Sequence, residues 1–420
     1  MKSFVRYLFA ALLMVSQAAT LLAADPFATY FTWDECRGSA RLYPVPQHPA
    51  AWPDSLTPVM INHVGRHGAR FPASPTHINA VVKALDDAAT AGSITPAGRR
   101  LRELAGRVTA AVGGRWGALD SIGAAEQRGL AARMYAEFSE LMERGRVSAV
   151  SSYVPRCVMS MYEFCHELSQ CCPKVSIAAK SGPAYSGLLR FFDSKAYKAT
   201  VRSSAYTTLI DSMQRATVTM APLRRVLGRD YKFGADSVAL ALDEYSMLAG
   251  LAAMGMEIDI SDWFTPGEYN ALWSAFNLNQ YMVRTATTLS AEPAETAAPL
   301  LDDLVATTDR FIAGDTTVAD VTLRFGHAET LMPLLSLMRL RGCYYLTHNF
   351  ESVALNWQDF NVVPMAANLR LVLFRSDGGR YYLRVDHNER PVPLLPGRSV
   401  LIVPWDVART YLLSLLPPYM

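Results

Sequence analysis

Short apolar runs and segments of helical periodicity alternate along much of the chain. Residues 58–61 form an apolar run with β-branched residues, which is typical of a buried strand. From about residue 76 to 91, apolar residues recur at helical spacing and predict a helix. The pattern returns at 321–326, a predicted strand, and at 331–340, a predicted helix. Strands that alternate with helices predict an α/β fold.

The middle of the chain has a different pattern. From about residue 183 to 313 the periodicity is helical, with few strand signals. After residue 318 the strands return, and residues 368–374 and 380–385 flank the turn sequence 376–379, which predicts a β-hairpin. We therefore expect an α/β core in two parts, 25–182 and 314–420, with residues 183–313 inserted as a mostly α-helical cap domain.

The N-terminus has the composition of an export signal. Lys2 and Arg6 precede an apolar run at 7–15, and small residues follow it up to residue 24. The run is short for a membrane-spanning helix, so we expect residues 1–24 to be a cleaved signal peptide rather than a retained anchor. Export predicts a secreted or periplasmic protein with no stable membrane anchor.

A cationic cluster follows the first predicted strand. Arg66 and Arg70 flank His67 and Gly68, at the point where the strand ends and the chain turns. Ligands of open α/β sheets bind outside the carboxyl ends of strands, and guanidinium groups bind phosphate oxygens in pairs. Nearby cations keep an imidazole neutral and nucleophilic, so His67 has the surroundings of a phosphate-attacking histidine. A surface basic loop with an incidental histidine is the simpler alternative.

A zinc site is a second alternative for this segment. His63 and His67 are four residues apart, as in helical zinc sites. However, they fall where a strand runs into a loop, and the two arginines repel a cation. We therefore predict no metal and no other cofactor.

Two further strand ends carry polar residues. His327 and Glu329 follow the predicted strand 321–326, and Arg156 follows an apolar, β-branched run. A carboxylic acid is a suitable general acid for a leaving oxygen, and a histidine adds a donor to phosphoryl oxygens. The alternative for Glu329 is favourable placement in the first turn of a helix, and for Arg156 it is simple solvation. A predicted helix at 123–144 places Glu126, Arg128 and Arg133 on a solvated face.

Residues 66–72, Arg-His-Gly-Ala-Arg-Phe-Pro, resemble the signature of histidine acid phosphatases, the branch of the histidine phosphatase superfamily that contains phytases. That branch usually has His-Asp as its second motif, whereas His327-Ala328-Glu329 resembles the multiple inositol polyphosphate phosphatases. Further stretches are similar to the same family, so that the resemblance spans nearly the whole chain after the leader: residues 188–193, 262–265, 366–369 and 388–393. The chain departs from the family within the expected cap, at 195–198 and 280–284.

The resemblance implies a histidine-phosphatase-like α/β core with an inserted helical cap, and it implies roles for residues. His67 attacks phosphorus and Glu329 protonates the leaving oxygen. The residues expected to bind substrate phosphates are Arg66, Arg70, Arg156, His327, Arg190 and Lys198. The implied substrate is a small-molecule inositol polyphosphate such as phytate. A phosphoglycerate-mutase-like phosphotransferase and a non-catalytic polyanion-binding protein remain alternatives.

Charge and cysteine content limit the partners. The predicted leader holds two of the 40 basic residues and no acidic one, so 38 basic and 38 acidic residues follow it. A chain with balanced charge is not expected to bind nucleic acid, and it attracts anions only through a local pocket. Six cysteines permit 15 complete pairings, so the sequence does not choose a connectivity, and we interpret them as structural or free. The sequence does not define an oligomeric state.

Overall fold

The structure, a computed structural model, describes residues 30–47 and 50–418. They form one eight-stranded sheet in the order β3–β2–β4–β1–β5–β6–β7, with β8 paired to β6. Strands β1 to β4 are joined by parallel pairs, and β5 to β8 are added in antiparallel pairs. The strands are β1 (Leu56–Arg66), β2 (Arg146–Ser151), β3 (Ser176–Ser181), β4 (Val321–Gly326), β5 (Asn368–Ser376), β6 (Tyr381–His387), β7 (Arg390–Val392) and β8 (Ile402–Pro404). The predicted α/β class is confirmed, and the predicted leader lies outside the described residues.

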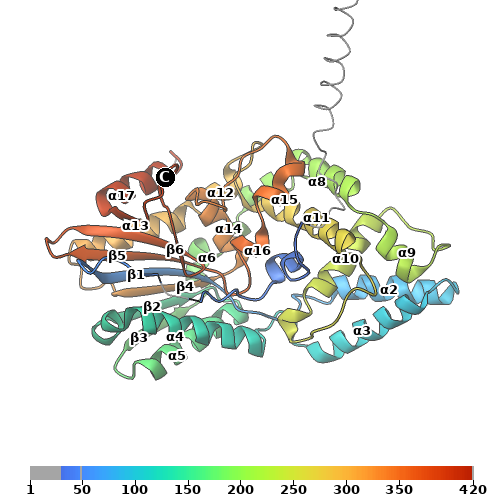
Figure 1. Ribbon diagram of the computed structural model, residues 1–420, viewed down its shortest axis with the longest axis horizontal. Coiled ribbons are helices and arrows are strands. Elements are labelled where there is room, and N and C mark those ends of the chain that lie inside the picture. The colour runs from blue at the N-terminus through green and yellow to red at the C-terminus, as the bar shows by residue number, and fades with distance from the viewer. Residues whose placement is uncertain (1–29, 48–49, 419–420) are drawn as a thin grey trace, which may run out of the picture.

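Helices cover both faces of this sheet (Figure 1). One face packs on α13 (Ala298–Ile312), α14 (Ala328–Leu337) and α17 (Trp405–Ser414), and the other on α4 (Ser121–Arg144) and α5 (Pro155–Cys171). Successive residues of β1 point to opposite faces, so Met60 and Val64 join the first core and Ile61 joins the second. Burial on both faces explains why these strands are apolar nearly throughout.

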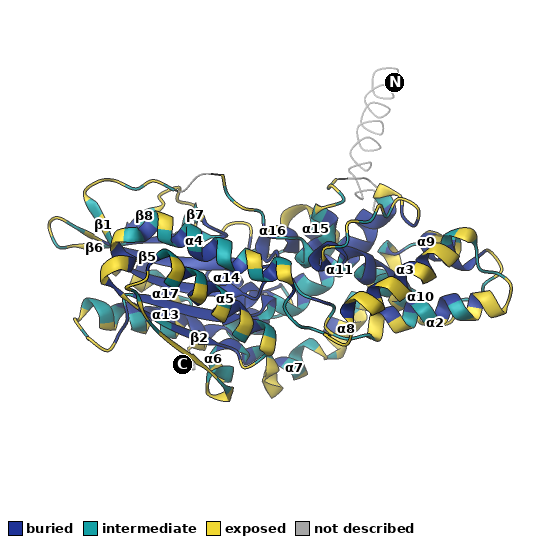
Figure 2. Cartoon of the chain, turned by 90° about the horizontal axis from the view of Figure 1, so that it is seen from below, coloured by how far each residue is buried: buried dark blue, intermediate teal, exposed yellow. Residues whose placement is uncertain are grey.

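A helical lobe extends beyond the sheet (Figure 2) and has its own apolar core, which contains the fully buried Trp273. It contains α2 (Thr76–Thr90), α3 (Pro96–Val112), α9 (Ala221–Leu227), α10 (Ser237–Ala249) and α11 (Pro266–Arg284). Shorter or peripheral helices complete the described chain: η1 (Glu35–Ala40), η2 (Pro183–Tyr185), α6 (Ser186–Leu189), η3 (Phe191–Asp193), α7 (Lys195–Val201), α8 (Ser204–Thr217), η4 (Ala252–Met254), α12 (Glu292–Glu295), η5 (Phe350–Ser352), α15 (Val353–Asn356) and α16 (Asp359–Val362).

The contacts of this lobe bear on the predicted domain division. Helices α2 and α3, which precede the predicted insertion, pack against α9 and α10, which lie inside it. Helix α13, also inside the predicted insertion, packs on β1 and α14 instead. The division at 183 and 313 stays a prediction. The lobe, when it is defined by its contacts, contains helices from two separate parts of the chain.

Most elements with strong local signals lie where the sequence predicts them. β4 coincides with the predicted strand 321–326, and β5 and β6 form the predicted hairpin. β1 extends to Arg66, so His63 lies inside the strand. Helix α14 begins at Ala328, three residues earlier than its apolar periodicity indicates, because Thr330 and the His327 backbone cap it.

Two further observations concern helix hydropathy and the cysteines. Among residues 30–47 and 50–418, no helix is long and apolar enough to cross a membrane. All six cysteines are free thiols, and Cys171 alone of them is not buried. In this structure the thiols act as small packing groups rather than as cross-links.

Glu244 is an unusual feature of the lobe. Its side chain on α10 is fully buried, and neither carboxyl oxygen has a hydrogen-bond partner. Burial raises the pKa of Glu244 to about 8, with Glu268 adding to the rise and Arg225 opposing it. The carboxyl is therefore protonated in the folded protein at neutral pH, although it ionises in the unfolded chain.

We predict that Glu244 makes the protein less stable as pH rises from about 4.5 to about 8. Below this window both states hold the proton, and above it the folded state has lost it, so the loss is then complete. Glu244→Gln should remove this contribution, on the order of 5 kcal/mol, from the pH dependence of unfolding. Urea unfolding at a series of pH values measures it, with the exposed Glu257→Gln as control. Parallel curves for wild type and Glu244→Gln would contradict the prediction.

Candidate active site

The carboxyl ends of β1, β2 and β4 meet at one edge of the sheet. Arg66 ends β1 in register with Gly326, the last residue of β4. Just beyond, the His67 amide donates to the Gly326 carbonyl (3.1 Å), and the Ser152 amide after β2 donates to the Phe325 carbonyl (2.9 Å). These backbone bonds bring the three polar strand ends together, as expected for the ligand edge of an α/β sheet.

His67 is buried beside these strand ends, with 2% of its surface exposed. Its Nδ1 lies 2.9 Å from the Gly68 carbonyl oxygen. Because a carbonyl can only accept, Nδ1 carries the proton and Nε2 keeps its lone pair. Burial lowers the pKa of His67 well below its usual value, and the charges of Arg66, Arg156 and Arg70 lower it further. The imidazole is therefore neutral and has a nucleophilic nitrogen.

Two backbone carbonyl oxygens fix the position of the Arg66 guanidinium. Its Nη1 donates to the carbonyls of Ser39 (2.6 Å) and Val363 (2.5 Å), and only 4% of the residue is exposed. Burial lowers the pKa of Arg66 to about 10. It remains a cation at neutral pH, with a fixed orientation.

Arg70 and Arg156 complete a cluster of three arginines around His67. Arg70 donates from Nη1 to the Phe71 carbonyl (2.9 Å), and Arg156, in the first turn of α5, lies 3.3 Å from His327 Nδ1. Burial lowers the pKa of Arg70 to about 10, and Arg156 and Arg66 add to this effect. The three guanidinium groups thus share one space, which is unfavourable until an anion enters it.

Helix α4 supports the loop that carries Arg70. A Cβ on Gly68 would lie 2.3 Å from the Gly123 carbonyl oxygen, so this glycine allows the loop to approach α4 closely. Glu126 accepts hydrogen bonds from the amides of Ala69 (2.7 Å) and Tyr43 (2.9 Å). The prediction that Glu126 lies on a solvated face is wrong, because the loop folds onto this turn of the helix.

His327 lies opposite His67, with 5.8 Å between the ring centroids. It is 1% exposed, and its Nε2 is 3.0 Å from Ser152 Oγ and 3.3 Å from Arg190 Nη1. Burial lowers the pKa of His327 to about 3; Glu329 opposes this, while Arg156, Arg190 and Arg66 add to it. At neutral pH the ring is therefore neutral and offers one N–H donor.

Glu329 lies in the first turn of α14, within the same field of charge. Burial alone would raise its pKa, but the charges of Arg284 and Arg66 outweigh this and hold the pKa of Glu329 at about 2. Arg284 Nη2 lies 3.8 Å from Glu329 Oε1. Without substrate, Glu329 is therefore a carboxylate at neutral pH.

Arg190 and Lys198 share one carboxylate, that of Asp193. Arg190 approaches it at 2.6 Å and Lys198 at 3.1 Å. The Arg190 guanidinium also lies over the rings of Tyr153 and Phe192 and reaches His327. Lys198 is more exposed than Arg190, with 41% against 17% of the side chain accessible. Arg190 thus belongs to the cluster, and Lys198 lies at its rim.

The zinc alternative lacks a set of ligands. The His63 ring packs against Phe164 and Phe325, with centroids 5.6 and 5.9 Å away. Burial, together with Arg370 and Arg324, lowers the pKa of His63 to about 3. Across residues 30–47 and 50–418, no three His, Cys, Asp or Glu side chains are grouped so that they could hold a metal ion.

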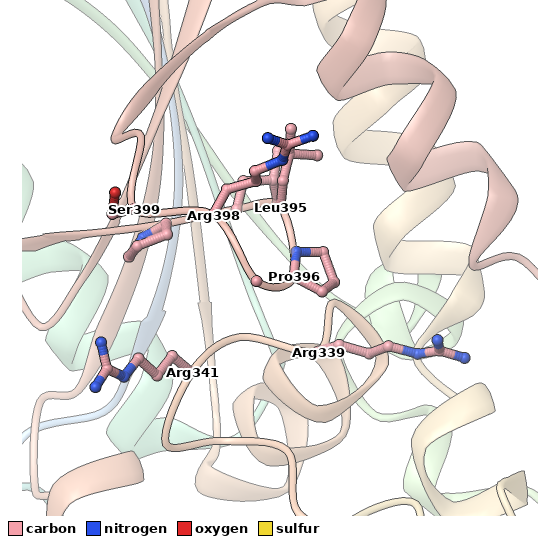
Figure 3. A pocket seen from close by; sticks show the side chains of 9 residues that line it. Arg339, Arg341, Leu395, Pro396, Arg398 and Ser399 are labelled. Atoms are coloured by element: carbon pink, nitrogen blue, oxygen red, sulfur yellow. The ribbon is translucent and has the colours of Figure 1, made fainter.

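A second group of arginines lines a cavity of about 490 Å³ beside residues 393–399. The guanidinium groups of Arg339, Arg341 and Arg398 point away from one another there (Figure 3). Because these three charges are separated, they do not form a site for a single phosphate. In this respect they differ from the arginines around His67, which converge.

Solved structures share this fold. The multiple inositol polyphosphate phosphatase of Bifidobacterium longum in its apo form matches with a TM-score of 0.73 and 18% identity, over 89% of this chain and 96% of that one. Its complex with inositol hexasulfate gives a TM-score of 0.69 and 18% identity, over 90% and 97%. The phytase from D. castellii gives 0.68 and 14%, over 94% and 88%. The chain thus has the predicted histidine-phosphatase-like fold. No protein-family model matches the sequence.

The structure brings together seven of the residues singled out in the sequence, and it adds others. His67, Arg66, Arg70, Arg156, His327, Glu329 and Arg190 form one cluster, and Lys198 lies at its edge. Their roles stay predictions. Sequence reasoning missed Arg284, Glu126 and Ser152. Only Ser152 had a usable signal, because it directly follows a strand; the other two depend on how helices pack.

We predict that Gly68→Ala weakens the site without unfolding the protein, because the new methyl group meets the backbone of Gly123 and displaces the arginine loop. Affinity for inorganic phosphate should fall at least about tenfold, a cost of roughly 1.4 kcal/mol. Calorimetric titration measures it. Gly106→Ala is the matched control, since nothing lies within 4 Å of its Cβ position. Unchanged affinity in Gly68→Ala would show that the close packing does not position the cations.

Proposed function

We propose that this chain is a phosphomonoesterase that hydrolyses inositol polyphosphates such as phytate through a phosphohistidine at His67. One observation carries the proposal: a neutral imidazole, with its Nδ1 proton bound to Gly68, lies among the guanidinium groups of Arg66, Arg70 and Arg156. The fold supports it, because the neighbours are a phytase and a multiple inositol polyphosphate phosphatase, one of them solved with inositol hexasulfate.

In the first step, His67 Nε2 attacks phosphorus and the bond from phosphorus to the inositol oxygen breaks. The three arginines and the His327 N–H stabilise the charge on the phosphoryl oxygens, where fixed donors contribute most. Nδ1–H keeps its bond to Gly68, so the positive charge that develops on the imidazole is shared with a carbonyl. No metal ion is needed for this step, since the arginines supply the positive charge.

The leaving alkoxide needs a proton, and Glu329 is the donor in our proposal. Its pKa is about 2 in the empty site, so it must gain a proton after the substrate binds. The phosphate charge offsets that of Arg66 and Arg284 and thereby raises the pKa of the carboxyl group. In the second step, water attacks the phosphohistidine, Glu329 takes its proton, and phosphate leaves.

The remaining predictions belong to the same proposal. Arg190 and Lys198 bind phosphates other than the reacting one, in competition with Asp193. The substrate is a small molecule, and the protein is exported to a secreted or periplasmic location. Release of phosphate without an acceptor distinguishes this proposal from a phosphotransferase, and turnover distinguishes it from a polyanion-binding protein.

We predict that His67→Ala abolishes phosphate release from phytate, with a loss of at least about 10⁴-fold, because no other group takes over the nucleophile's role. A phosphoryl adduct, trapped by alkaline quench and weighed by intact mass, should form in wild type and be absent in the variant. Inositol hexasulfate, which cannot be hydrolysed as a phosphate, should still bind.

His166→Ala, at an exposed histidine on α5, is the matched control and should retain full activity. Circular dichroism confirms the folding of both variants. Substantial phosphate release from folded His67→Ala would exclude His67 as the nucleophile.

We also predict that Glu329→Gln affects substrates according to their leaving group. The amide keeps the shape but cannot donate an acid proton, and general acid catalysis contributes roughly 10²–10⁴-fold. Turnover of phytate should fall by that factor. Turnover of p-nitrophenyl phosphate should change much less, because phenolate leaves with little help. Steady-state kinetics on both substrates test this, and equal losses would mean that Glu329 is not the donor of the first step.

A further inference from the structure

Arg284 connects the helical lobe to the proton donor. It is the last residue of α11, and its Nη2 lies 3.8 Å from Oε1 of Glu329 on α14. About 20% of the Arg284 side chain and 36% of the Glu329 side chain are accessible. The two charges thus face each other across a boundary between segments far apart in sequence.

The position of the Arg284 guanidinium is fixed by aromatic neighbours. Its Cζ lies 5.9 Å from the centroid of Phe192 and 5.5 Å from that of Tyr197, and its Nη1 donates to the Tyr197 hydroxyl. That hydroxyl in turn donates to the Val283 carbonyl (2.7 Å). A stacked guanidinium that is hydrogen-bonded on one side has little freedom to turn away from Glu329.

The separation of 3.8 Å matters for the chemistry. It is too long for a hydrogen bond, so the carboxyl group is not locked to Arg284 and can turn toward a leaving oxygen. It is short enough for a strong charge interaction in a partly buried site. Arg284 therefore acts on Glu329 as a fixed positive charge rather than as a binding partner.

Other charged or titratable groups also face Glu329. They are His327 from its own turn, Arg66 and Arg70 from β1 and the loop after it, Tyr197 from α7 and Cys157 from α5. Arg66 and Arg70 are needed for the reacting phosphate in our proposed function. Among the cations that lower the pKa of Glu329, Arg284 has the largest effect. The proposed phosphoryl transfer does not otherwise use it.

We propose that Arg284 is a positioning residue whose fixed charge attracts the Glu329 carboxylate without a hydrogen bond and sets the pH at which Glu329 acts as a proton donor. The inference rests on the proposed function, since it acts through Glu329. It assigns the helical lobe a part in the chemistry: the end of α11 controls the proton, while the sheet edge supplies the nucleophile and the phosphate-binding arginines.

The test uses Arg284→Met, which keeps a long apolar stem against Phe192 and Tyr197 but removes the charge, and Arg284→Lys, which restores it. In Arg284→Met, the alkaline limb of kcat for phytate should move up by about one pH unit, because a cation that favours the carboxylate is gone. At the pH optimum kcat should fall about tenfold, while KM changes less than threefold. Arg284→Lys should reverse at least about half of the shift seen in Arg284→Met.

A double variant separates this role from a structural one. On the Glu329→Gln background, Arg284→Met should cause no further shift of the limb and less than a threefold further loss of kcat, because both changes act on one group. Arg215→Met, an exposed arginine of α8 paired with Asp211, is the control and should behave as wild type. Circular dichroism verifies folding, and Arg284→Gln replaces the Met variant if that one does not fold.

The outcomes distinguish the two proposals. If Glu329→Gln shows its leaving-group effect but Arg284→Met leaves the limb unchanged, or the two losses multiply in the double variant, the role of Arg284 is refuted and the proposed function stands. If Glu329→Gln reduces turnover of both substrates equally, the donor role of Glu329 is refuted, and the role of Arg284 is refuted with it.

Discussion

The crowding of positive charge at one edge of the sheet is the constraint on which the rest of the structure depends. Besides burial, the charge of Arg156 lowers the pKa of Arg66, and the charges of Arg156 and Arg66 lower the pKa of Arg70, in a chain whose formal charge is only +2. The protein as a whole therefore gives little long-range attraction for anions, and affinity must come from the local cluster. Backbone carbonyls hold two of these arginines, Arg66 and Arg70, in place. In the proposed function, an entering phosphate replaces this repulsion by hydrogen bonds.

Helix α4 connects the arginine cluster to the sheet. Its first turns hold the arginine loop through Glu126 and through the contact between Gly68 and Gly123. Further along, Arg133 pairs with Glu389, and Glu137 pairs with buried arginines of β5 and β6, Arg370 and Arg384. Removing one partner of a buried pair costs about 3–5 kcal/mol, so these pairs make sliding of α4 expensive. The loop is thus held by a helix that is itself fixed.

The sequence predicts those parts of the site whose signal is local. His67 and Glu329 each follow a short apolar strand, so the strand end alone locates them. Glu126 and Arg284 lie on helices with ordinary amphipathic patterns, and only the folding of distant segments onto them brings them to the cluster. The same holds for the lobe, because nothing in residues 76–112 indicates that α2 and α3 pack with helices more than 100 residues later. Local periodicity predicts elements, and tertiary packing decides their partners.

The charges also determine the order of events in the proposed reaction. The charges of Arg284 and Arg66 keep Glu329 ionised, so the empty site has no acid to donate. Arrival of the anion both fills the cluster and raises the proton affinity of the carboxyl group, which couples acid catalysis to occupancy. After the alkoxide has taken the proton, the phosphoryl group remains on the imidazole, which is a good leaving group. The second step therefore needs little help from a base, and a carboxylate held at low pKa by its neighbours is sufficient for it.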